Sequence, residues 1–310
     1  MPDTTSPSQS AQHDQPHAPG ETEIAALGVT DQGRVRKNNE DNLVACDLSS
    51  EEILAGPFEF HRALGPLGVL LLVADGMGGQ ACGELASHMC SDLAPARLLE
   101  SVRQLQTDGQ NELGELLRDA LESANRSILE LSRNQPGCKG MGTTATAAWV
   151  RGSSVLVAQV GDSRAYLIRN GKMAQLTRDQ TFLNYLVEMG AVDAEAESRD
   201  DPRRSILVQA LGTSEKLNVV LTGAEVQNGD RLLLASDGLY GAVGADEILE
   251  IAGGSAGLEA RCHTLIDTAN RHGGPDNITL ILAEISGLPA IDPGAPVRVQ
   301  ALSVRKPETI

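Results

Sequence analysis

Residues 69–79 read VLLLVADGMGG, and this stretch decides how the chain folds. Six apolar residues in succession are typical of a strand that is buried on both faces. Asp75 stands where this strand ends, and the glycines after it favour a tight turn. A second run, RLLLAS at residues 231–236, leads in the same way into Asp237-Gly238. A rigid sheet that delivers carboxylates to its strand ends predicts an all-oxygen site for a hard divalent cation.

Strand-like and helix-like segments alternate in groups along the rest of the chain. We predict strands at residues 25–29, 42–46, 69–74, 145–151, 154–160, 163–169, 217–222, 231–235 and 278–285. Apolar residues at helical spacing predict helices from about residue 85 and over 113–134, 245–252 and 258–271. Asn170-Gly171 predicts a hairpin turn, and residues 217–222 and 231–235 resemble a second hairpin pair. Grouped strands with paired helices predict an α+β layered sandwich, not alternating β-α-β units.

Composition divides the chain into one domain and two polar ends. Residues 1–23 are rich in Pro, Ser, Thr and Gln, which predicts a disordered leader and no signal peptide. Residues 24–285 contain no repeat and no low-complexity linker, so we predict a single domain. Residues 181–212 interrupt its strands with one short helix and charged residues, and their length predicts either a functional flap or a mobile surface insertion. Residues 286–310 turn to Gly, Pro and polar residues, which predicts a flexible tail.

The charge balance excludes several classes of partner. The 310 residues carry 42 acidic and 25 basic side chains, a formal net charge of −17. Nucleic acids and anionic membranes attract basic surfaces, so the chain is predicted to bind neither. No apolar run approaches the roughly 20 residues of a membrane helix. A soluble, self-repelling surface is the simplest interpretation of the charge.

The cysteines and histidines show no metal-binding or disulfide pattern. Five scattered cysteines, without a C-x-x-C pair, argue against a disulfide framework and against a thiolate zinc site. The six histidines form no H-E-x-x-H motif. A reducing, cytoplasmic compartment fits this usage.

The glycine turn after Asp75 also permits a nucleotide-binding interpretation. Gly76-x-Gly78-x-x-Ala81 follows a strand and precedes a helix, as a dinucleotide-binding fingerprint does. That fingerprint requires a second strand ending in an acidic residue about 20 positions later, where this chain is still predicted to be helical. Asp75 would also repel a pyrophosphate. We therefore reject the nucleotide interpretation.

Six short motifs occur in an order that resembles a known family. They are R-x-x-N-E-D at residues 36–41, D-G-M-G-G at 75–79, G-T-T at 142–144, G-D-S-R at 161–164, S-D-G at 236–238 and D-N-x-T at 276–279. Over about residues 24–285 the chain resembles the protein phosphatase 2C family, the metal-dependent serine/threonine phosphatases, and specifically its bacterial branch. The resemblance implies a four-layer α-β-β-α sandwich with two central antiparallel sheets and a metal site at one edge.

The resemblance also implies a role for each motif residue. Asp75 would bridge two Mn²⁺ or Mg²⁺ ions, with the Gly76 carbonyl on one of them and Asp237 and Asp276 on the other. Glu40 and Asp41 would act partly through metal-bound waters, and Asp162 matches the position that joins a third, weaker metal. Arg36 would grip the phosphate, because a guanidinium binds it bidentately. A water bridging the ions would attack phosphorus directly, so Asp75 and Arg36 are the predicted catalytic residues.

The implied activity is that of a serine/threonine protein phosphatase in cytoplasmic signalling. Its partners would be phosphorylated proteins and a bacterial serine/threonine kinase that it opposes, and a monomer is the default. Two positions depart from the family pattern: Met77 replaces a histidine of many eukaryotic members, and Gly241 replaces a further aspartate. A non-catalytic phosphatase-fold regulator and a hydrolase of small phosphate esters therefore stay open as alternatives.

Overall fold

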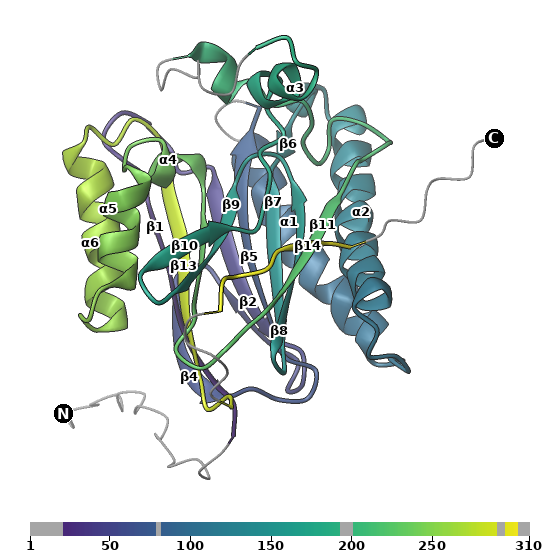
Figure 1. Cartoon of the computed structure of the whole chain (residues 1–310). Helices are drawn as coiled ribbons and strands as arrows, with labels where there is room; N and C mark the ends of the chain where they lie inside the picture. The colour runs from purple at the N-terminus through teal and green to yellow at the C-terminus, as the bar shows by residue number, and fades with distance from the viewer. Residues whose placement is uncertain (1–20, 79–81, 193–200, 290–294, 303–310) are drawn as a thin grey trace, which may run out of the picture.

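The computed structural model describes residues 21–78, 82–192, 201–289 and 295–302 (Figure 1). The predicted leader, residues 1–23, lies almost wholly outside these residues, as does the central part of the predicted flap. Within the described part of the chain, no helix is both long enough and apolar enough to cross a membrane.

Two antiparallel sheets stand face to face at the centre of the molecule (Figure 1). The first sheet has the strand order β10 (Lys172–Gln175), β9 (Arg164–Arg169), β12 (Arg231–Ala235), β13 (Ile278–Ser286), β1 (Glu23–Asp31) and β4 (Phe58–Ala63). The second has the order β14 (Gln300–Ala301), β11 (Val220–Glu225), β8 (Ser154–Val160), β7 (Ala145–Arg151), β5 (Val69–Met77), β2 (Asp41–Asp47) and β3 (Glu52–Ala55), with β6 (Gly142–Thr143) also paired to β5.

Helix pairs cover the two outer faces, and short helices lie at the upper end in Figure 1. The helices are α1 (Cys82–Val102), α2 (Gln110–Asn134), α3 (Phe182–Glu188), α4 (Asp237–Tyr240), α5 (Ala245–Gly253) and α6 (Leu258–Arg271), with 3₁₀ turns η1 (Pro136–Cys138) and η3 (Pro202–Ser205). α1 and α2 pack on the second sheet, and α5 and α6 pack on the first. This arrangement confirms the predicted four-layer α-β-β-α sandwich.

The residues of β5 show why its sequence is continuously apolar. Leu70, Leu72 and Ala74 face the helices α1 and α2, whereas Leu71 and Val73 face the opposite sheet. Side chains of a strand alternate between its two faces, and both faces of β5 are buried. The strand therefore carries no polar residue until Asp75, where it reaches the end of the sandwich.

The predicted hairpin after β9 is confirmed, but the second predicted hairpin is wrong. Asn170 and Gly171 both have positive φ, as a two-residue turn between paired strands requires. By contrast β11 pairs with β8, and β12 pairs with β9 and β13 in the other sheet. The chain changes sheets between residues 225 and 231, so strands that are neighbours in sequence are not neighbours in space.

Part of the segment predicted as a flexible tail is ordered against the domain. β14 pairs with β11 at the edge of the second sheet. Leu302, which follows it, is 8% exposed and packs in the core between that sheet and α2. Leu302 and the pairing with β11 thus attach this short strand to the domain.

A disulfide joins Cys82, at the start of α1, to Cys138, at the end of η1. The cysteine spacing did not predict this pair, because 56 residues separate the partners and the fold alone brings them together. The remaining cysteines, Cys46, Cys90 and Cys262, are buried as free thiols.

Candidate functional site

A cleft of about 570 Å³ opens at the end of the sandwich where β5 and β12 finish. Of the eight residues predicted from the motifs, seven line this cleft: Arg36, Glu40, Asp75, Gly76, Asp162, Asp237 and Asp276. Asp41 lies beneath its surface, 8% exposed. The structure thus brings together residues that lie up to 240 positions apart in the chain.

Strand ends deliver the carboxylates. Asp41 begins β2 and is the register partner of Asp75 on β5. Asp237 is the first residue of α4, two residues after the end of β12, and Asp276 stands two residues before β13. Sheet pairing fixes Asp41 and Asp75, and Asp237 and Asp276 lie next to paired strands, so a rigid part of the fold holds the carboxylates.

Asn277 holds the loop that carries Arg36 and Glu40. Its Nδ2 donates to the carbonyl oxygens of Gln32, at 2.9 Å, and Asn38, at 2.8 Å. Its Oδ1 accepts the Glu40 backbone N–H at 2.9 Å. Motif reasoning assigned no role to Asn277, although an amide within D-N-x-T offers both donors and an acceptor. Its bonds indicate a positioning role.

The backbone around Asp75 and Gly76 leaves no space for a larger residue. A Cβ on Gly76 would lie 2.2 Å from the Gly83 carbonyl oxygen of α1. The Asp75 carbonyl oxygen accepts hydrogen bonds from the Thr143 hydroxyl and the Thr144 backbone N–H, and Thr144 Oγ1 accepts the Asp75 N–H. The G-T-T motif therefore fixes the strand end that presents Asp75.

Crowding of buried acids raises their pKa values. Burial raises the pKa of Asp41 to about 7, against hydrogen bonds from Ser236 and Thr279. Burial, with the charge of Asp237, raises the pKa of Asp162 to about 8. Burial and the charge of Asp276 raise the pKa of Asp237 to about 6. The pKa of Asp75 is raised well above its usual value by burial and by the charges of Asp41 and Asp237. These four aspartates can all be ionised together only when added positive charge offsets their mutual repulsion.

The donor atoms of the cleft suit hard divalent cations, although the side chains are not arranged around a common point. Among the described residues, no three His, Cys, Asp or Glu side chains are already placed to hold one ion. Asp276 Oδ2 instead accepts a 2.5 Å hydrogen bond from Arg36 Nη2. Asp237 Oδ1 is buried without a hydrogen-bond partner, and an orphaned carboxylate oxygen is a position where a cation belongs. Oxygen-only donors of this kind suit Mg²⁺ and Mn²⁺.

A second hollow, of about 430 Å³, adjoins the cleft and shares Asp162 and Asp237 with it. Tyr240 donates from its hydroxyl to the Asp162 carbonyl oxygen at 3.0 Å. The Arg164 guanidinium lies 3.7 Å from the centre of the Tyr240 ring and pairs with Asp179 at 2.6 Å. These residues, which motif reasoning left without a role, support the Asp162 side of the site.

Comparison with known proteins gives one family. The model of the family described as Protein phosphatase 2C matches residues 26–184. The chain is 36% identical over 255 residues to a serine/threonine phosphatase stp of Listeria monocytogenes, covering 82% of this chain and 93% of that protein.

Solved structures resemble the whole described sandwich. The Mycobacterium tuberculosis serine/threonine phosphatase PstP is similar with a TM-score of 0.69 at 34% identity, covering 85% of this chain and 99% of that one. A structure of the PstP catalytic domain in complex with two manganese ions is similar with a TM-score of 0.67 at 33% identity, covering 86% of this chain and 99% of that one.

Proposed function

Since this chain belongs to the protein phosphatase 2C family, we propose that its acidic cleft hydrolyses phosphoserine and phosphothreonine in proteins with the help of Mn²⁺ or Mg²⁺. The chain is a metal-dependent serine/threonine phosphatase by its family. One observation carries the proposal for this particular site. Asp75, Asp162 and Asp237, all with raised pKa values, line the cleft together with Arg36, and Asp41, whose pKa is also raised, lies beneath it. This is the arrangement that metal-assisted phosphoryl transfer needs.

We assign the ions to the residues of the cleft as follows. Asp75 would serve two ions, and the Gly76 carbonyl would bind one of them. Asp237 and Asp276 would hold the other, and Glu40 and Asp41 would act partly through waters bound to the ions. Asp162 would contribute to a third, weaker position. When bound, the ions lower the pKa of a water and stabilise the charge on the phosphoryl oxygens. The free Asp237 Oδ1 supports this assignment.

Arg36 is the proposed phosphate-binding residue. Its side chain is 55% exposed at the cleft, and its present partner is Asp276. If a cation were to take Asp276, the guanidinium would be free to bind a phosphate in the cleft. A planar guanidinium can then hold two oxygens of a phosphate at once.

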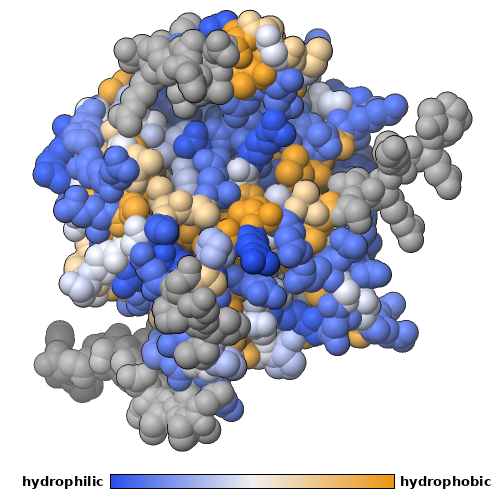
Figure 2. All heavy atoms as spheres, in the orientation of Figure 1, coloured by the Kyte–Doolittle hydropathy of each residue, from blue (hydrophilic) through white to orange (hydrophobic). Residues whose placement is uncertain are grey.

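The predicted flap forms one wall above this cleft. Leu207 and Ser205 line the cleft, and backbone hydrogen bonds tie this strip to residues 180 and 182. Phe182, Tyr185 and Met189 of the same region are 39%, 49% and 67% exposed, and Figure 2 shows apolar residues gathered at this end. We assign substrate selection to the flap, since loops beside a rigid site commonly select the substrate.

The partners follow from the proposed reaction. Phosphorylated proteins are the substrates, and a serine/threonine kinase of the same cell must supply them. Kinases act where ATP is available, which supports a cytoplasmic location. We further propose that residues 24–285 form the catalytic unit and that it acts as a monomer.

The first experiment measures phosphate release from a phosphothreonine peptide during a Mn²⁺ titration. We expect turnover that rises with Mn²⁺ in the wild type and is lost in Asp75→Asn. Asp108→Asn is the matched control, because Asp108 is 87% exposed and pairs with Arg151, outside the cleft.

Two outcomes would contradict the proposal. Peptide binding without phosphate release at any Mn²⁺ concentration would support a non-catalytic regulator, which the missing aspartate at Gly241 also favours. Strong preference for a small aryl phosphate over the peptide would support a hydrolase of small esters.

A further inference from the structure

The Cys82–Cys138 disulfide connects the two chain segments that pack on either side of Gly76, the start of α1 and the turn before β6. On one side, Cys82 opens α1, whose next residue, Gly83, packs against Gly76 and the Glu40 carboxylate: a Cβ on Gly83 would lie 2.3 Å from Glu40 Oε2. One turn later Ser87 donates to the Glu40 carbonyl oxygen at 2.6 Å. The first turn of α1 therefore sets the position of Glu40.

On the other side, Cys138 precedes the strand that pairs with β5. The Met141 N–H donates to the Cys138 carbonyl oxygen at 3.0 Å, and a Cβ on Gly78 would lie 2.7 Å from Met141 Cα. Next in sequence is β6, whose Thr143 is the register partner of Gly76. The disulfide thus links the start of α1 to the turn that leads into β6, and both of these segments flank the strand end that carries Asp75 and Gly76.

The surroundings of the disulfide differ from those of the other cysteines. Burial raises the pKa of each free thiol, Cys46, Cys90 and Cys262, to about 12, which keeps these residues inert. Cys138, in contrast, lies 4% exposed within a short turn whose neighbours at residues 135–137 and 139–140 are all exposed. Cys138 is therefore covered by a single surface turn.

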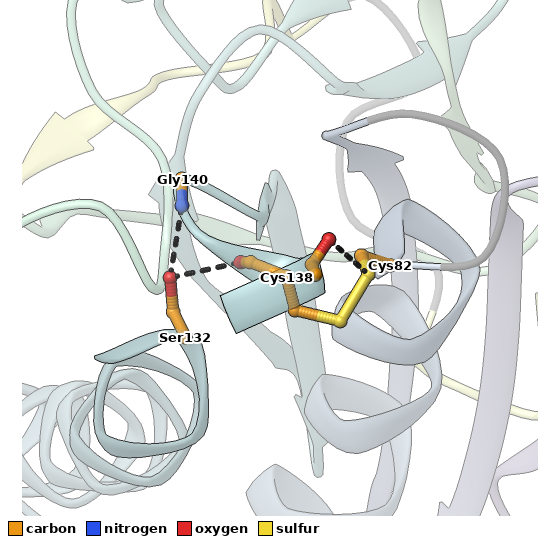
Figure 3. The surroundings of a disulfide bond; sticks show 5 residues. Cys82, Ser132, Cys138 and Gly140 are labelled. Atoms are coloured by element: carbon orange, nitrogen blue, oxygen red, sulfur yellow. Dashed lines mark hydrogen bonds between the residues drawn. A yellow bond between two sulfur atoms is a disulfide. The ribbon is translucent and has the colours of Figure 1, made fainter. Parts of the chain in front are cut away.

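The structure also provides for the reduced state. Cys82 Sγ lies 3.3 Å from the Gly137 carbonyl oxygen, so a Cys82 thiol would find an acceptor in place (Figure 3). Ser132 of α2 holds η1 independently of the disulfide: its Oγ donates to the Cys138 carbonyl oxygen and accepts the Gly140 N–H, both at 3.1 Å. Neither hydrogen bond requires the disulfide, so the turn has an anchor in both states.

From this geometry we propose that Cys82 and Cys138 form a reversible redox site that controls the affinity of the cleft for divalent metal. A dithiol attacks one sulfur to form a mixed disulfide. Its second thiol then closes a cyclic disulfide, and two electrons and two protons pass to the protein as two cysteine thiols. Reduction frees α1 from η1 and weakens the support of Gly76 and Glu40. A disulfide in a cytoplasmic protein commonly has such a sensing role, so the redox role depends on the cytoplasmic location proposed above.

The test compares Mn²⁺ affinity in the two redox states of the full chain. Wild-type protein is divided into an untreated sample and one that is reduced with a dithiol and then desalted, and Mn²⁺ binding is measured by calorimetry. Alkylation followed by mass spectrometry counts the accessible thiols of each sample. We expect two additional alkylated cysteines after reduction. We also expect Mn²⁺ binding to be weaker by about tenfold, as when a group that holds metal ligands in place is lost.

Two variants distinguish this effect from a general effect of the dithiol. Cys82→Ser/Cys138→Ser should match the reduced wild type whether or not it is treated. Cys90→Ser, on the same helix but outside the pair, should respond as the wild type does. Re-oxidation of the reduced wild type with a small disulfide should restore the original affinity, which a misfolded sample would not do.

The proposal is overturned if both cysteines are alkylated without reduction, or if the two redox states bind Mn²⁺ equally. An equal response of the double variant to dithiol would overturn it as well. Absence of Mn²⁺ binding in every sample would instead contradict the metal-dependent function itself, and the redox control with it.

Discussion

At the scale of single residues, the site is a set of charges that compensate for one another. Asp276 is held by Arg36, and Asp41 is held by the Ser236 hydroxyl, which donates to it at 2.7 Å. Asp237 keeps one oxygen unpaired. A cation held by these carboxylates would compete with the Arg36 and Ser236 hydrogen bonds, so the same side chains would serve metal and substrate binding.

Arg36 allows these two roles to be separated. We expect Arg36→Lys to lower kcat/KM on a phosphothreonine peptide by about 10- to 100-fold, because an ammonium loses the bidentate contact, and charged hydrogen bonds contribute about 1.5–3 kcal/mol. Mn²⁺ affinity should not fall, since the variant leaves Asp276 no less available. Steady-state kinetics and calorimetry measure the two quantities.

Lys37→Ala is the control for Arg36→Lys. Lys37 lines the same cleft, and its substitution removes a positive charge but leaves the planar guanidinium of Arg36 intact. A similar loss of kcat/KM in both variants would show that general positive charge, not bidentate binding, is what the cleft requires.

Motif reasoning located the proposed ligands better than the residues that hold them in place. Asp75 and Asp237 are visible in sequence because an apolar run ends just before each of them. Asn277, Ser236 and Tyr240 act through hydrogen bonds to partners far away in the chain. These residues meet their partners only after the chain has folded, so no local sequence pattern predicts the hydrogen bonds.

At the scale of elements, the strands with two buried faces were predicted well and the edge strands were not. β12 was predicted with its observed bounds, because its apolar run is sharply limited. β3 and β4 were missed, although Phe58 and Phe60 alternate with polar residues along β4. The switch between sheets after β11 was also missed, because it depends on packing between layers and not on turn residues.

The flap is the element whose contribution can be tested most directly. We expect Leu207→Ser to lower kcat/KM more on a phosphoprotein than on a small aryl phosphate, because Leu207 lines the cleft at the flap side and would contact only an extended substrate. The ratio of the two kcat/KM values is the quantity to measure.

Val208→Ser is the matched control for Leu207→Ser: Val208 is the next residue, is 54% exposed and does not line the cleft. Equal losses on both substrates in the Leu207 variant would rule out a role of this residue in selecting proteins.

At the scale of the whole molecule, the buried acids link stability to pH. The pKa values of Asp41, Asp162 and Asp237 are raised to about 7, 8 and 6, so the folded protein binds more protons than the unfolded chain above about pH 4. This contribution to stability is present below that pH and is lost as the pH rises to about 8. Metal-free protein should therefore unfold more easily at about pH 8 than at about pH 5, by at least about 1.4 kcal/mol, the equivalent of one pKa unit.

Urea unfolding with a chelator at the two pH values measures this difference. Asp41→Asn should reduce it, since an amide does not titrate, and saturating Mn²⁺ should abolish it. A metal-free stability that is constant or rises over this range would show that the carboxylates are compensated by other means.

The short strand β14 has a consequence for how the protein stays dispersed. It pairs with Thr222 and Gly223 at the outer side of β11, where backbone groups would otherwise be open to a strand from another molecule. A chain cut at residue 286, where the sequence suggests that the domain stops, would lose this cover together with Leu302. Residues 300–302, which do not line the cleft, are therefore expected to lower the tendency of the molecule to aggregate.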